Sequence, residues 1–310
     1  LFSRIYSDTS LSLLIVLSAS AWGLYWLPLR TIEYAGMAGS WSIVLVNACP
    51  LIVLFPLLIF NITGLKIHPA PMTCAGFMIG AAFTLYANGL VETTVIRATL
   101  LFYLSPIWST ILGIFWLSER LTSARIVSIF VAVIGLFLLL ADLNNSDNIQ
   151  LNIGDLFGFL SGIFWAIGAT IINRWPNAPT LPLTTIVYIA TTILSVLFAV
   201  FLYQDPIPNI DVIKGSFFTA AIWSIIILLP GFWIIFRVSQ LLFPGRVGIL
   251  MMSEVIVAIV SARILIPEES MAFLQWVGAG AILFAGVIEV FFGYSKIEKT
   301  PESLRSSPSR

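Results

Sequence analysis

A single carboxylate interrupts an apolar stretch near the end of the chain. Glu254 stands between GILMMS and VIVAIVSA, within about 20 mostly apolar residues that begin after Arg246 and end before Glu268. An ionisable residue inside such a stretch costs about 2.5–3.5 kcal/mol on insertion scales and marks a functional site by default. We expect Glu254 to act as a counter-charge for a cationic group or as a protonation site. The alternative is an ion pair with an arginine of another helix.

Aromatic residues near the start form a second candidate group. Trp22, Tyr25 and Trp26 are spaced i, i+3 and i+4, which predicts that they share one side of a helix. Their rings could stack on an aromatic solute or surround an ammonium group by cation–π attraction. Trp165 occupies the corresponding place in the second half of the chain. The alternative role for these rings is packing between helices.

Several polar residues complete the candidate site. Tyr86 and Asn88 fall within one apolar run, where a buried amide needs a partner, either a solute or a neighbouring helix. Trp223 is a further candidate in a later run.

Three charged residues lie near the predicted outer ends of the helices. Arg97 and Arg263 could capture a carboxylate or form an outer gate with Glu92, and snorkelling to the membrane surface is the alternative for both arginines.

The composition defines the class of protein that carries these residues. The chain is 59% hydrophobic and only 10% charged, which is typical of a polytopic membrane protein. It has no basic patch, so we expect no nucleic-acid partner. With a single histidine, His68, and two cysteines in apolar runs, Cys49 and Cys74, we expect no metal, cofactor or enzymatic activity. The chain begins at Leu1 rather than methionine, so we expect that the native start has been trimmed, without a cleavable signal peptide.

The apolar residues form ten runs, each long enough to cross a bilayer as a helix. The runs are 11–30, 39–60, 71–91, 96–117, 123–141, 155–174, 181–203, 214–235, 246–266 and 271–293. The longest polar break, 142–154, separates two sets of five helices at 11–141 and 155–293. A short segment, 1–10, and a polar tail, 294–310, complete the chain. A cytoplasmic N-terminus puts eleven Lys and Arg inside and four outside, so we expect both termini in the cytoplasm.

The two sets of helices repeat one another. A shift of 149 positions sets Arg97 on Arg246 and Ser105 on Glu254, and Trp22 aligns with Trp165. Each set crosses an odd number of times, so the two have opposite orientation. We therefore predict an all-α integral membrane protein of ten transmembrane helices in two inverted five-helix repeats, with a site near the midplane between them.

These motifs resemble one family. The Trp22-Gly23 pair, the LSP sequence at 104–106 and the later Gly113 and Glu119 are similar to EamA-type permeases of the drug/metabolite transporter superfamily. The resemblance implies a central cavity lined mainly by helices 1, 3, 4, 6, 8 and 9, with Tyr103 and Ser105 facing it. It covers the chain from about residue 11 to 293. The second repeat has Val255 in place of Pro106, so we expect no proline kink in helix 9.

The sequence thus indicates a secondary transporter in a bacterial inner membrane. We expect a small polar metabolite as the substrate, with an amino acid, a quaternary ammonium compound or a related amine as the best match to Glu254 and the aromatic residues. The alternative is a proton-coupled exporter of neutral or anionic metabolites or drugs, in which Glu254 carries protons. The absence of a Walker motif excludes direct use of ATP, and a monomer is the simpler expectation.

Overall fold

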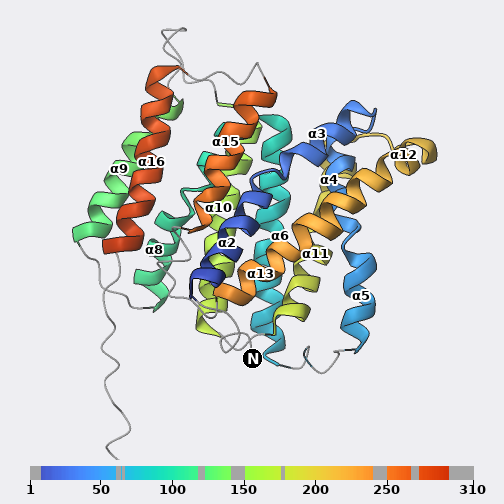
Figure 1. Cartoon of the computed structure of the whole chain (residues 1–310), viewed down its shortest axis with the longest axis horizontal. Coiled ribbons are helices and arrows are strands. Elements are labelled where there is room, and N and C mark those ends of the chain that lie inside the picture. The colour runs from blue at the N-terminus through green and yellow to red at the C-terminus, as the bar shows by residue number, and fades with distance from the viewer. Residues whose placement is uncertain are drawn as a thin grey trace, which may run out of the picture.

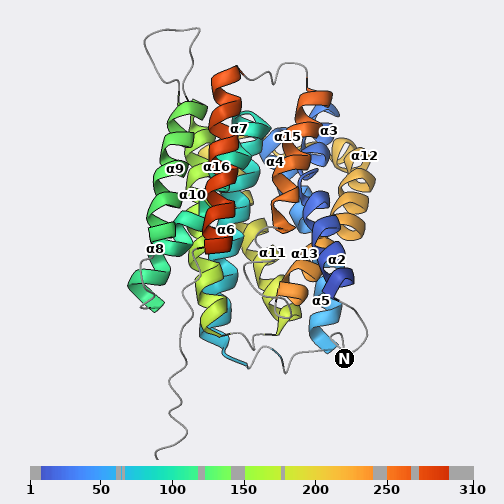
Figure 2. The ribbon, with the colours of Figure 1, turned by 60° about the vertical axis from the view of Figure 1, so that its left-hand side comes forward.

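The structure is a computed structural model, and it describes residues 8–60, 64, 67–117, 123–140, 151–175, 179–239, 250–266 and 272–292. Most of the central loop, the polar tail, Glu119 and Glu268 lie outside these residues. Every regular element of the described residues is a helix (Figures 1 and 2). The helices are α2 (Asp8–Trp22), α3 (Trp26–Tyr34), α4 (Gly39–Ala48), α5 (Leu51–Phe60), α6 (Pro69–Glu92), α7 (Val95–Phe102), α8 (Ser105–Leu117), α9 (Ser123–Leu140), α10 (Ile153–Arg174), α11 (Thr180–Leu197), the π-helix η2 (Phe198–Leu202), α12 (Ile210–Ala221), the π-helix η3 (Ile222–Leu228), α13 (Leu229–Ser239), α15 (Ser253–Leu265) and α16 (Phe273–Phe292).

Seven helical stretches of the described residues are long and apolar enough to cross a membrane. They are Thr9–Tyr34, Gly39–Phe60, Pro69–Glu92, Val95–Gly113, Ile153–Ile172, Thr180–Leu202 and Ile210–Val238. Each matches one predicted run. The other three runs are described over α9, α15 and α16, of which α9 and α16 contain shorter apolar helices. The count of ten and the inverted repeat therefore stay predictions.

Proline breaks two of the spans close to the predicted site. The first span ends as α2 at Trp22 and resumes as α3 at Trp26. Pro28 has no N–H to offer the carbonyl of Leu24, which instead accepts from Leu27 at 3.0 Å. In the same way Pro106 has no N–H for Phe102, and the span is interrupted at Tyr103 and Leu104. The sequence predicts one apolar run at 11–30 and one at 96–117, with a proline kink at Pro106 in the second run, whereas the break near Leu24 was not predicted.

The helix α6 forms the centre of the bundle. In the most apolar 18 residues of α6, 78% are buried inside the protein, whereas the value for the corresponding stretch of Gly39–Phe60 is 33%. The helix α10 packs along α6 and also contacts α7 and α8, whereas α9 and α16 pair with each other at one side (Figures 1 and 2). Glycines permit the closest approaches: a Cβ at Gly162 of α10 would lie 2.8 Å from the carbonyl oxygen of Phe102.

Gly23 brings α2 against α15. A Cβ at Gly23 would lie 2.5 Å from the carbonyl oxygen of Glu254 and 3.0 Å from Cβ of Val257. The main chain that carries the buried carboxylate therefore packs directly on the break in the first span.

We predict that Gly23→Ala lowers the free energy of unfolding by about 1–3 kcal/mol, because the new methyl group meets main-chain atoms that have to move. Thermal unfolding of the purified protein in detergent measures the loss. Gly280→Ala in α16 is the control, since a Cβ there has nothing within 4 Å. Equal melting temperatures for the two variants would contradict the close packing.

A buried ion pair joins α7 to α10. Arg97 Nη2 lies 2.6 Å from Asp155 Oδ2, and the side chain of Asp155 is only 4% exposed. Asp155 also forms a capping box with Asn152 at the start of α10 and accepts from Thr93 at 3.2 Å. The carboxylate of Asp155 thus satisfies a helix N-terminus and ties the first half of the chain to the second.

We predict that Asp155→Ala destabilises the protein by about 3 kcal/mol, because Arg97 then loses the partner of its partly buried charge. The double variant Arg97→Ala, Asp155→Ala is expected to be more stable than Asp155→Ala alone. A double-mutant cycle on melting temperatures tests this, and strictly additive losses would show that the pair does not couple.

Candidate functional site

The carboxylate of Glu254 lies in the interior of the bundle. Its residue is 5% exposed, and the hydroxyl of Tyr103 lies 2.8 Å from its Oε2. The same hydroxyl lies 3.0 Å from the main-chain oxygen of Met251. A phenol has one proton, so it donates fully to only one of these acceptors at a time. The two ion pairs found in the described residues do not include Glu254, so the alternative of an arginine partner finds no support there.

Tyr103 and Glu254 both lie at or next to interruptions of helices. Tyr103 lies in the interruption between α7 and α8, and Met252 forms a turn immediately before α15. We expected no proline kink in helix 9, because Val255 stands where the first repeat has Pro106. The helix is nevertheless interrupted at Met252, although no proline is present there. The hydroxyl of Ser253 donates to the main-chain oxygen of Leu250 at 2.9 Å, a bond that competes with the regular helical pattern.

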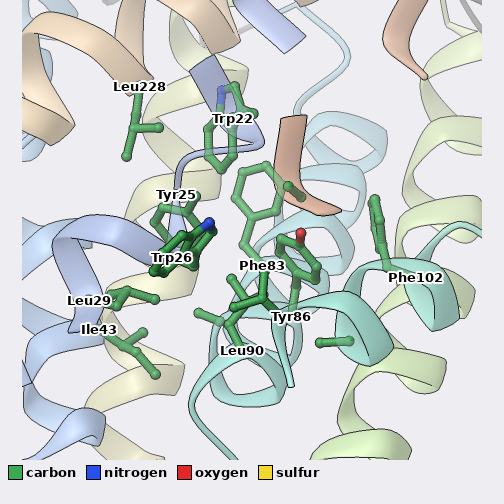
Figure 3. Close-up of a cluster of buried hydrophobic side chains, with 14 of the residues drawn as sticks. Trp22, Tyr25, Trp26, Leu29, Ile43, Phe83, Tyr86, Leu90, Phe102 and Leu228 are labelled. Atoms are coloured by element: carbon green, nitrogen blue, oxygen red, sulfur yellow. The ribbon is translucent and has the colours of Figure 1, made fainter. Parts of the chain in front are cut away.

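An aromatic cluster that includes Tyr103 lies beside this carboxylate. Figure 3 shows five of its members, Trp22, Tyr25, Phe83, Tyr86 and Phe102. Its members come from α2, α6, α7, α10 and α13 and the two breaks, and we name it the central aromatic cluster. They are Trp22, Tyr25, Phe83, Tyr86, Phe102, Tyr103, Trp165 and Phe232. Ring centroids of neighbouring members lie 5.0–6.0 Å apart, from Trp22 on Phe83 to Phe102 on Trp165. Most of these contacts are tilted or edge-on, arrangements that are favourable for aromatic rings.

The polar atoms of the cluster differ in how they are satisfied. Tyr86 shares a hydrogen bond with Thr99 at 3.0 Å, and Tyr25 accepts from Asn47 at 2.8 Å. The indole nitrogen Nε1 of Trp22 is buried and has no hydrogen-bond partner among the described residues.

The structure brings most of the predicted site residues together. Trp22, Tyr25, Trp165, Tyr86 and Tyr103 all belong to the central aromatic cluster. Trp26 begins α3, and its indole donates to the hydroxyl of Ser261 on α15 at 3.1 Å. Ser105 is buried in the first turn of α8, next to the break that holds Tyr103.

Other predicted residues lie apart from the cluster. The amide of Asn88 donates to the carbonyl of Thr84 one turn earlier in α6, at 2.7 Å. Glu92 and Trp223 are half-buried, the latter in the π-helix η3, and Arg263 is exposed on α15. Arg97 is engaged with Asp155, as described above. The outer gate between these arginines and Glu92 stays a prediction.

Sequence reasoning missed several participants. Phe83 and Phe102 were indistinguishable from the other phenylalanines of apolar runs, although Phe83 lies one turn before Tyr86. Phe232 carries no sequence signal at all. Asp155 could have been found, because Asn152 three residues earlier makes a capping sequence. No three histidine, cysteine or acidic residues of the described ranges are placed to hold a metal ion.

Known proteins were compared with this chain. No curated protein matches it. A crystal structure described only as that of a protein shares the fold, with a TM-score of 0.58 and 16% sequence identity over 91% of this chain and 96% of the other. Residues 9–141 match the EamA-like transporter family. That match covers the Trp22-Gly23 pair and the LSP motif of the first half, and it supports the resemblance of the chain to EamA-type transporters of the drug/metabolite transporter superfamily.

Proposed function

We propose that this membrane transporter moves a small polar amine across the bacterial inner membrane. The family consists of transporters rather than enzymes, so a lipid bilayer and a small-molecule substrate are implied. The substrate that we propose is an amino acid, a quaternary ammonium compound or a related amine. It would bind at Glu254 and the central aromatic cluster, with Trp26 and Ser105 at its edges.

One observation carries this proposal. Glu254 is almost fully buried, and the partner found for its side chain is a neutral phenol rather than a cation. A carboxylate in such a place needs either a proton or a positive charge to offset its desolvation. An ammonium group would supply the charge, and the neighbouring rings would add cation–π attraction.

The mechanism that we propose is alternating access by two inverted five-helix repeats of a monomer. Support comes from the internal repeat of the sequence. It comes also from the hydrogen bond between Tyr103 of the first repeat and Met251 of the second. The helix breaks beside that point suit a site whose walls move. Both termini lie in the cytoplasm in this proposal, on the distribution of Lys and Arg.

The second candidate is proton coupling, with Glu254 as the proton site of an exporter of neutral or anionic solutes. The paired acceptors of Tyr103 favour it. A neutral Glu254 can donate a hydrogen bond to the phenol oxygen of Tyr103 while the phenol donates to the main-chain oxygen of Met251. An ionised Glu254 instead accepts the hydrogen bond of the phenol. The hydrogen bonds thus accommodate both protonation states. The titratable side chains near Glu254 in the described residues are Tyr103 and Tyr86.

We predict that Glu254→Gln abolishes binding of amines, because the amide offers no counter-charge. A solute present at 100 times its dissociation constant adds about 2.7 kcal/mol of stability, so thermal unfolding against amino acids, quaternary amines, carboxylates and sugars reads the effect. The control is Asp211→Asn, which neutralises an exposed acid in the first turn of α12.

The outcome also separates the two candidates. Loss of amine stabilisation in Glu254→Gln alone supports the counter-charge. If the stabilising solutes are neutral or anionic and bind the variant equally well, the amine proposal is wrong. A pH dependence of transport in liposomes that disappears in Glu254→Gln, with solute exchange retained, would then favour the proton site.

A further inference from the structure

The indole N–H of Trp22 is an unused donor in the interior of the protein. Trp22 is 5% exposed, and its Nε1 is buried without a partner in the described part of the chain. Tryptophan can only donate through this atom, and a buried donor without an acceptor costs free energy. Native proteins satisfy most buried polar groups, so an unpartnered donor inside the proposed binding region is available to an acceptor from outside the chain.

Space lies beside this donor. Gly231 of α13 faces the edge of the indole, and a Cβ built at this glycine would lie 3.6 Å from both Cδ1 and Nε1 of Trp22. The nearest contact of this Cβ would be the carbonyl oxygen of Ser18 at 3.5 Å. These are ordinary van der Waals distances, so a methyl group fits without displacing its neighbours. Gly231 therefore leaves unfilled a volume next to the N–H that any other residue would occupy.

A second unpartnered group belongs to a ring that also contacts Phe232. The hydroxyl of Tyr188 is buried without a partner, and Tyr188 is 1% exposed. Phe232 separates the two groups, with its centroid 5.8 Å from that of Trp22 and 6.1 Å from that of Tyr188. Two side chains able to donate thus lie around one phenylalanine.

Glu254 lies elsewhere on the same cluster. Tyr103, which holds its carboxylate, contacts Phe102, and the chain of ring contacts runs through Trp165 and Phe83 to Trp22. Figure 3 shows Phe83 and Tyr86 between Trp22 and Phe102. One region of the cluster thus offers an acceptor, Glu254, and another offers donors.

We infer that Trp22 Nε1 and Gly231 form a subsite for a hydrogen-bond acceptor of the transported solute. The acceptor is an oxygen of a carboxylate, carbonyl or hydroxyl group. The inference rests on the proposed function, in which Glu254 binds the ammonium group, and it narrows the substrate to amines that also carry such an oxygen. Trp22 supplies the donor, and Gly231 determines specificity by leaving room for the acceptor.

Three solutes with the same phenyl body test the subsite by equilibrium binding to the purified full chain. Phenylalanine carries both ammonium and carboxylate, phenethylamine only the ammonium, and 3-phenylpropionate only the carboxylate. We expect Gly231→Ala and Trp22→Phe to lower the affinity for phenylalanine about tenfold, the effect of losing one hydrogen bond to a charged group. The affinity for phenethylamine should change little. Gly215→Ala, in the same span but with nothing within 4 Å of its Cβ, should change neither.

A measurement without solute tests the space at Gly231. Because a methyl group fits there, we expect Gly231→Ala to keep the melting temperature of the wild type, and we expect the same of Gly215→Ala. A fall as large as that of Gly23→Ala would overturn the subsite. So would an equal loss of phenylalanine and phenethylamine binding, which indicates crowding of the whole site, or no loss of either.

Failure of the proposed function has a different signature. If the wild type binds only 3-phenylpropionate, Glu254 is not an ammonium site, and a selective loss in Gly231→Ala would still support the acceptor subsite. If the wild type binds none of the three, the proposed amine substrate is refuted and this subsite with it.

Discussion

A carboxylate removed from water needs compensating interactions, and Glu254, in the interior of this protein, is subject to that requirement. Glu254 gives up hydration at a position where none of the basic side chains in the described ranges forms an ion pair with it. The phenol of Tyr103 offers a single hydrogen bond in return. That bond is short enough to be strong, yet one neutral donor does not offset the desolvation of a full charge. A buried carboxylate without a cationic partner is stabilised by a proton or by an external cation, which is the physical reason for proposing Glu254 as the functional centre.

The geometry around Glu254 depends on interrupted helices. A continuous helix satisfies its own main-chain groups and has no carbonyl to spare for a partner. The break at Tyr103 and the turn at Met252 release main-chain groups within the bundle, and the hydroxyl of Tyr103 bonds to one of them, the oxygen of Met251. The irregular main chain is tolerated because it is buried in protein rather than exposed to lipid.

Close glycine contacts fix where these breaks meet. Gly23 allows α2 to lie on the main chain of Glu254, and Gly162 allows α10 to lie on the carbonyl of Phe102. In a lipid environment there is little hydrophobic drive to bring apolar helices together, so small residues that permit close van der Waals contact decide which surfaces associate. The two residues of the Trp22-Gly23 pair have different roles. Gly23 permits the close approach of α15, and Trp22 contributes a ring to the central aromatic cluster.

The sequence alone determined the class of the molecule and its most unusual residue. Apolar runs of membrane-spanning length report their environment directly, because a lipid interior excludes polar side chains over a fixed thickness. The cost of a charge in that interior is also local, so Glu254 could be identified without knowing its neighbours. The helix breaks at Tyr103 and near Leu24 follow from prolines already visible in the sequence.

Only the tertiary structure decided what each side chain meets. The hydrogen bond between Tyr103 and Glu254 joins residues 151 positions apart, and no pattern of spacing specifies such a pair. Phe83, Phe102 and Phe232 resemble every other phenylalanine of an apolar helix, and only packing shows that they share one cluster. The pairing of Arg97 with Asp155 and the unpartnered indole of Trp22 are likewise properties of helix surfaces brought together. Spacing along one helix records which residues share a face, whereas contacts between helices depend on which faces meet.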